Sequence, residues 1–270
     1  MSTSHPNSPE ESFPGSPTLV WAQLIVVLTA PSLGALCGLW FWPGPLGATL
    51  YALCKLILYG IPVYILIRQL GFAGCVSYPF QGLFTQNAAI GLVSGLVIGC
   101  VILLLWVLVL AGRVNVAPVL DAMRDNGMTN ALKFLAFAAW LCLANSLLEE
   151  IVFRWYVDTR LRIIGLPFAI AVPVSAFVFT LHHVIVLSAF FHWPLVLTGS
   201  LGVFGGGVLW SLLLRYSKSL SPSWISHALV DAAIMLIGWW VLSAAQVPHQ
   251  VPHQVPHQVP HQVPHQVPQA

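Results

Sequence analysis

Charge is what this sequence lacks. Only 7% of its 270 residues are Asp, Glu, Lys or Arg, against about 25% in average soluble domains, and 58% are hydrophobic. The formal net charge of +2 is too small, and the ten Lys and Arg too scattered, to indicate nucleic-acid binding. The composition therefore excludes an ordinary soluble domain and indicates a multi-pass membrane protein whose partners include the lipid bilayer and no nucleic acid.

Paired cysteines are also absent. The five cysteines lie mostly within apolar runs and show no paired spacing: Cys37, Cys54, Cys75, Cys100 and Cys142. Small apolar positions of this kind are where free cysteine is commonly buried. We therefore predict neither a disulfide framework nor a cysteine-based zinc site.

Both ends of the chain lack the features of a folded segment. Residues 1–18 are rich in Ser and Pro and contain no Lys or Arg, so they do not resemble a signal peptide. We predict a disordered N-terminal segment followed by a retained first span. Residues 247–270 begin with five copies of Val-Pro-His-Gln, and the regular prolines predict an extended low-complexity tail rather than a metal site.

Long apolar runs fill the remainder of the chain. A helix needs about 20 apolar residues to cross the hydrocarbon core. Seven runs meet this requirement: Leu19–Trp42, Leu46–Ile67, Ala88–Ala111, Leu132–Arg162, Pro167–Phe190, Leu195–Tyr216 and Ser223–Ala244. The fourth run exceeds one bilayer and should project beyond it, whereas the charged stretch Val116–Thr129 predicts a surface helix. The predicted fold is an all-α polytopic membrane bundle of about seven transmembrane helices, with N-terminal helices in 19–131 and a core in 132–246.

The positions of Lys and Arg predict the orientation. With the N-terminus inside, inner loops carry five of them and the outer side three. The inner five are Arg68, Arg160, Arg162, Arg215 and Lys218, and the outer three are Arg113, Arg124 and Lys133. We therefore expect a multi-pass protein with its N-terminus inside, in a bacterial inner membrane. We expect the functional residues described below to lie in the cytoplasmic half of that membrane.

Carboxylates inside the fourth apolar run are the strongest functional signal. A charged residue at the bilayer centre costs roughly 2.5–3.5 kcal/mol on insertion scales, so Glu149 and Glu150 need a partner or a chemical role. Glu150 and Arg154 are four residues apart and can pair on one helix face, whereas Glu149 points about 100° away. Asn145 shares the face of Glu149 and is an auxiliary candidate. A salt-bridged helix end is the plain structural alternative.

Histidines occur in two later spans. His182 and His183 follow an apolar run in the fifth span, and His227 and Asp231 are four residues apart in the seventh. A carboxylate at this spacing can fix the tautomer of a histidine. Polar contacts between helices are the structural alternative for each. Counting about 1.5 Å per residue from the turn at Gly165 places Glu149 and His183 at the same height, so the three positions can converge between helices 4, 5 and 7.

These residues resemble a known family. Glu-Glu-x-x-x-Arg from Glu149, Phe-x-x-x-His from Phe179 to His183, and His-x-x-x-Asp from His227 are similar, in this order, to the motifs of the CAAX-protease and bacteriocin-processing family. That family comprises intramembrane glutamic endopeptidases, including type II CAAX prenyl endopeptidases. The resemblance extends over about residues 132–244 and selects His183 rather than His182.

Two residues depart from the family pattern. Trp155 stands where the family commonly has Gly after the Arg, and Asp231 stands where the prenyl endopeptidases have Asn. An ionised Asp231 cannot donate a hydrogen bond to an oxyanion as an amide would.

The resemblance implies an enzyme that hydrolyses a peptide bond near the membrane surface. Glu149 would be the general base, His183 would share the water, and His227, oriented by Asp231, would donate to the oxyanion; Glu150 and Arg154 would be structural. The expected substrate is a peptide or protein at the membrane, processed at a CAAX-type C-terminus or matured from a membrane-anchored precursor, and no cofactor is expected. Glu149, His183 and His227 could also bind Zn in a membrane metalloprotease. A non-catalytic immunity, binding or transport protein is the alternative from another class.

Overall fold

The computed structural model describes residues 16–83 and 85–246, and its regular structure in these ranges is helical throughout. Seven of its helices are long and apolar enough to cross a membrane: Thr18–Phe41, Pro45–Phe80, Gln86–Leu110, Ala131–Ile163, Phe168–Phe190, Trp193–Ser217 and Ser221–Gln246. The predicted all-α polytopic bundle with seven spans is therefore confirmed. Of the predicted disordered segment, residues 1–15 lie outside the described residues, and Ser16 caps the first helix. The repeat tail, 247–270, also lies outside them.

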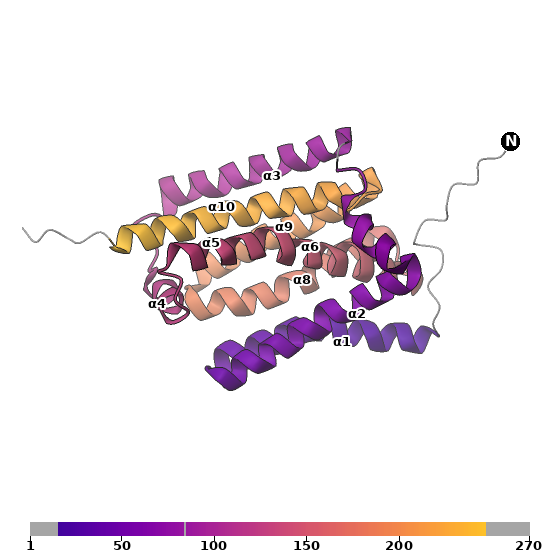
Figure 1. Ribbon diagram of the computed structural model, residues 1–270, viewed down its shortest axis with the longest axis horizontal. Helices are drawn as coiled ribbons and strands as arrows, with labels where there is room; N and C mark the ends of the chain where they lie inside the picture. Colours follow the sequence, from indigo (N-terminus) through magenta and orange to yellow (C-terminus); the bar gives the residue numbers. More distant parts are fainter. Residues whose placement is uncertain (1–15, 84, 247–270) are drawn as a thin grey trace, which may run out of the picture.

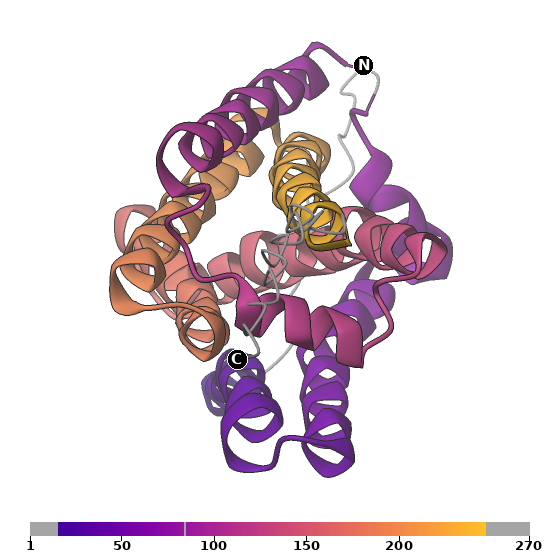
Figure 2. The ribbon, with the colours of Figure 1, turned by 90° about the vertical axis from the view of Figure 1, so that its left-hand side faces the viewer.

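The helices pack as a bundle, with α3 along one side, α1 and α2 along the other, and the remaining long helices between them (Figure 1). Their bounds are α1 Pro17–Leu36, α2 Pro45–Ser77, α3 Gln86–Leu105, α4 Ala117–Asp125, α5 Ala131–Ala139, α6 Ser146–Glu150, α7 Asp158–Ile163, α8 Phe168–Phe190, α9 Trp193–Ser217 and α10 Ser221–Gln246. Figure 2 shows α1 and α2 at the bottom of the bundle and α3 at the top. The predicted surface helix within Val116–Thr129 is present as the short α4.

A row of glycines brings α3 against α10. Gly91, Gly95 and Gly99 recur once per turn on α3 and are all buried. A Cβ added at Gly91 would come within 2.3 Å of the carbonyl oxygen of Pro222, so only glycine allows the two backbones to approach this closely. The contact places the N-terminal half of α10, which carries His227, at a fixed depth.

The fourth span is a continuous helix of 33 residues with two widened turns. Residues Trp140–Asn145 and Ile151–Val157 are π-helical and lie on either side of the short α6. Widened turns leave carbonyl groups that need other donors. Trp224 donates from its indole to the Leu143 carbonyl at 3.0 Å, and Ser175 donates to the Phe153 carbonyl at 2.8 Å. Neighbouring helices α10 and α8 therefore stabilise both distortions.

Burial in this bundle is inverted relative to a soluble protein. The charged side chains Glu149, Glu150 and Arg154 are 3%, 0% and 1% exposed, whereas Leu108 and Leu132 are 71% and 76% exposed. Lipid can solvate the apolar exterior, so apolar surface need not be hidden there. Every residue from 151 to 161 is buried, which makes the fourth span the centre of the bundle.

The glycine row predicts a stability difference between two alanine substitutions. We expect Gly91→Ala to destabilise the protein by about 1–3 kcal/mol, because the added methyl group must push α3 away from α10. Gly60→Ala is the matched control, since a Cβ there meets nothing within 4 Å and alanine favours a helix. Thermal unfolding of both variants in detergent measures the difference, and equal midpoints would contradict close packing at Gly91.

Candidate active site

Glu150 is the centre of a buried ion network. Its Oε1 lies 3.5 Å from Nε of Arg154 and accepts a 2.9 Å hydrogen bond from Nδ1 of His227. The spacing of Glu150 and Arg154 predicts the first contact, and the structure contains it. The second contact joins the fourth span to α10. Because charges at low dielectric are stable only when paired, this network fixes the rotation of the fourth span.

Two aromatic rings form a platform beneath the network. The guanidinium carbon of Arg154 lies 4.4 Å from the ring centroid of Phe179 and 5.1 Å from that of Trp210. The imidazole of His227 stacks on Trp210, with centroids 3.9 Å apart and planes inclined by 14°. Trp210 is itself held by a 3.1 Å hydrogen bond from its indole to Ser226. Helix α9 thereby adds a residue to the site that the sequence pattern does not distinguish from an ordinary apolar one.

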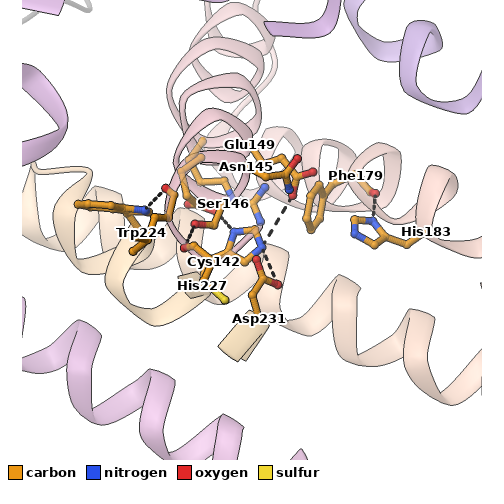
Figure 3. Close-up of polar contacts among 12 residues, drawn as sticks. Cys142, Asn145, Ser146, Glu149, Phe179, His183, Trp224, His227 and Asp231 are labelled. Atoms are coloured by element: carbon orange, nitrogen blue, oxygen red, sulfur yellow. Dashed lines mark hydrogen bonds and ion pairs between the residues drawn. The ribbon is translucent and has the colours of Figure 1, made fainter. Parts of the chain in front are cut away.

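The carboxylate of Glu149 lies between α2 and α10. Its Oε2 is 3.8 Å from Nε2 of His227, and Figure 3 shows how the two residues lie. Its Oε1 is 3.4 Å from Nζ of Lys55 and 3.5 Å from the hydroxyl of Tyr59. The two oxygens of one carboxylate therefore face different partners, a cation and phenol on one side and a histidine on the other.

Lys55 and Tyr59 on α2 were not among the candidates from the sequence. A signal was present, because Lys55 is the only charged residue in the run Leu46–Ile67, and ionisable residues inside a membrane are functional candidates by default. Asn145, the auxiliary candidate, accepts a 2.7 Å hydrogen bond from Tyr59 and lies 3.5 Å from Lys55. It therefore acts on Glu149 through these two residues, rather than through the direct hydrogen bond that its spacing suggests.

His183 reaches the site from α8. Its Nδ1 lies 2.9 Å from the carbonyl oxygen of Phe179, which can only accept, so Nδ1 carries a proton and the neutral ring keeps Nε2 as an acceptor. The Phe179 ring contacts both His183 and His227, with centroid distances of 4.6 Å and 6.0 Å. His182 is buried beside them, with its ring 4.0 Å from that of His183.

Asp231 does not orient His227 as the spacing predicts. Its Oδ1 is 3.8 Å from Nε2 of His227, which is too long for a direct hydrogen bond. The orienting bond comes from Glu150, at Nδ1. Spacing along one helix shows which residues share a face, but it does not show that a carboxylate from another helix reaches the ring first. Oδ1 of Asp231 and Oε2 of Glu149 instead lie near the other ring nitrogen, Nε2, each at 3.8 Å.

Trp155 fills the position where the resembling family commonly has glycine. Its indole is 2% exposed and lies edge-on to the ring of Tyr78, with centroids 6.4 Å apart. The larger side chain is therefore accommodated by packing against the segment that follows α2.

The arrangement has the groups that hydrolysis of an amide needs. A carboxylate on Glu149 and a potential donor on His227 lie 3.8 Å apart, and a neutral acceptor on His183 packs against the Phe179 ring that also borders His227. In the part of the chain that the structure describes, no group of three or more His, Cys, Asp or Glu side chains has the spacing to hold a metal ion. The alternative of Zn binding by Glu149, His183 and His227 therefore rests on the residue types alone.

Comparison with known proteins agrees with the motifs. Residues 131–233 match the family model described as type II CAAX prenyl endopeptidase Rce1-like. No curated protein and no solved structure matches the chain. The resemblance that the three motifs carry is therefore confirmed over this segment, which contains Glu149, His183, His227 and Asp231.

The ion network predicts different roles for the two glutamates in folding. We expect Glu150→Ala to lower the yield of folded protein by removing the partner of both Arg154 and His227, at a cost of about 3–5 kcal/mol for an unpaired buried charge. Glu149→Ala should lower the yield less, because Lys55 is 19% exposed and keeps Tyr59 and Asn145 as partners. The monodisperse fraction after detergent extraction measures both, and the reverse order would exchange the two roles.

Proposed function

Because residues 131–233 match the type II CAAX prenyl endopeptidase family, we propose that this chain is an intramembrane endopeptidase that activates water with Glu149. The observation that carries the proposal is the position of the Glu149 carboxylate, buried beside His227 in a segment similar to that family. A buried carboxylate with one oxygen facing a histidine is well placed to hold and deprotonate a water molecule.

Glu149 and His183 would prepare the nucleophile. A water between them donates one hydrogen to Oε2 of Glu149 and the other to Nε2 of His183, whose Nδ1 is committed to the Phe179 carbonyl. Attack on the peptide carbonyl carbon transfers a proton to Glu149 and moves the carbonyl π electrons onto oxygen. Glu149 then gives that proton to the leaving nitrogen, and the C–N bond breaks to yield a carboxylic acid and an amine. The second hydrogen of the water passes from the acid to the amine, which leaves a carboxylate and an ammonium group.

His227 would stabilise the oxyanion. Three carboxylates contact it, Glu149, Glu150 and Asp231, and two of them also contact a cation, Glu149 with Lys55 and Glu150 with Arg154. A protonated His227 balances these charges, and it donates from Nδ1 to Glu150 while its Nε2–H faces the reacting groups. Asp231 supports this charge, although it cannot replace the amide donor that asparagine provides in the prenyl endopeptidases.

The proposed substrate is a membrane-bound peptide or protein. CAAX-type processing hydrolyses a peptide bond near a lipidated C-terminus. Maturation of a peptide or of a membrane-anchored protein hydrolyses the same kind of bond. We place the site in the cytoplasmic half of a bacterial inner membrane, because Arg160, Arg162 and Arg215 end spans that run in the same direction. A site near that surface can receive a substrate held in the inner leaflet.

The proposal predicts that Glu149→Gln abolishes cleavage. We expect at least about a 100-fold loss in kcat, because the amide cannot accept the proton from water. The measurement uses proteoliposomes with a farnesylated CAAX peptide, together with proteomic comparison of membrane-protein termini in cells that carry each variant. Asp121→Asn, at an exposed carboxylate on α4, is the matched control. Unchanged termini and wild-type function in the Glu149→Gln variant would favour a non-catalytic binding, immunity or transport role.

Metal removal tests the alternative mechanism. We expect treatment with 1,10-phenanthroline, followed by dialysis, to leave cleavage unchanged, since Glu149 and the histidines act on water directly in the proposal. Loss of cleavage that added Zn²⁺ restores would instead assign Glu149, His183 and His227 as metal ligands.

A further inference from the structure

Lys55 is an unusual residue for its place in the fold. It lies in the N-terminal half of α2, outside the segment 131–233 that matches the family model, and in an otherwise uncharged apolar run. Its side chain is 19% exposed, and its Nζ contacts the buried carboxylate of Glu149 at 3.4 Å. An ammonium group at such a position is retained only where it has a specific partner.

The surroundings of Lys55 direct it to a single oxygen of Glu149. Nζ donates to the Tyr59 hydroxyl at 2.9 Å, and Tyr59 in turn donates to Oδ1 of Asn145 at 2.7 Å. Lys55 and Tyr59 both approach Oε1 of Glu149, at 3.4 Å and 3.5 Å. The other oxygen, Oε2, faces His227.

We propose that Lys55 is a positioning residue for the general base, which fixes Oε1 of Glu149 and balances its charge so that Oε2 is presented to the attacking water. This inference rests on the proposed function. It makes the N-terminal helices part of the active site, because α2 supplies the counter-charge that the matched segment does not contain.

The charge balance shows why this cation matters. The ionisable groups near Glu149 are Lys55 and Tyr59 on α2, Glu150 and Arg154 on its own helix, His182 and His183 on α8, and His227 and Asp231 on α10. Without Lys55 the carboxylates exceed the cations even when His227 is protonated. The buried cluster then favours gaining a proton, and Glu149, which has lost its nearest cation, becomes easier to protonate.

The experiment compares Lys55→Met, Lys55→Arg and Tyr59→Phe with wild type in proteoliposomes containing a farnesylated CAAX peptide. We expect Lys55→Met to lower kcat about 100-fold at pH 7 with little change in KM, and to regain activity as pH rises, because Glu149 stays protonated to higher pH. Lys55→Arg should restore most of the activity, and Tyr59→Phe should cost less than Lys55→Met because the charge remains. Lys133→Met, at an exposed lysine in α5, is the control.

Other results would overturn the inference. Wild-type kinetics in Lys55→Met would show that Lys55 has no role in catalysis. A loss that is equal at every pH and that Lys55→Arg does not restore would show that Lys55 acts only in packing. A stability measurement separates this failure from failure of the proposed function, since it requires no cleavage. Thermal unfolding in detergent should show that Lys55→Met costs less stability in a Glu149→Gln background than in wild type, and additive effects would contradict the pairing.

Discussion

Pairing of charge at low dielectric is the constraint on which this bundle depends. Glu150, Arg154 and His227 are each almost completely buried, and each is tolerable only because the others are present. The pairing holds the fourth span in one rotation and ties it to α10. This rotation turns Glu149 toward α2. The proposed base is therefore positioned by the pairing of its neighbour Glu150, in which Glu149 takes no part. Fold and chemistry are thus joined through a residue adjacent to the proposed base.

The helices around this network contribute in different ways. Helix α8 brings His183 and the Phe179 ring, α9 brings Trp210 beneath His227, and α2 brings Lys55. The glycine row of α3 contributes no polar group, but it packs α3 closely against α10, the helix that carries His227. Helices outside the segment that matches the family model therefore also contact the site, and one of them supplies the cation that pairs with Glu149.

Several features of the site follow directly from the sequence. Apolar runs of sufficient length predict the seven spans, and the i,i+4 rule predicts the pairing of Glu150 with Arg154. Matched depth of Glu149 and His183 predicts that these two can converge with His227, and the structure places His227 3.8 Å from Glu149. All three inferences need only helical geometry, which the membrane enforces strongly because backbone groups must be satisfied within each helix.

Contacts between helices were harder to predict. The partner of His227 was expected to be Asp231, on the same helix, and it is Glu150 instead. Lys55 carried a usable signal, yet nothing in its spacing indicates which helix it faces. Trp210 carried no signal, since an aromatic residue in an apolar span is ordinary. Such contacts depend on how each helix is rotated about its axis, and single-helix periodicity leaves that rotation undetermined when the exterior is also apolar.

The two π-helical segments of the fourth span bear on how this chain is compared with others. A π turn holds one residue more than the α-helical turn it replaces, so a related helix without the bulge is one residue shorter across the same distance. Such a relative would align with this chain only through a gap of one residue inside a transmembrane helix. Glu149 and Glu150 lie between the two π-helical segments, and Arg154 lies within the second. The spacing of this motif to Asn145 or Asp158 is therefore a poor guide to shared ancestry.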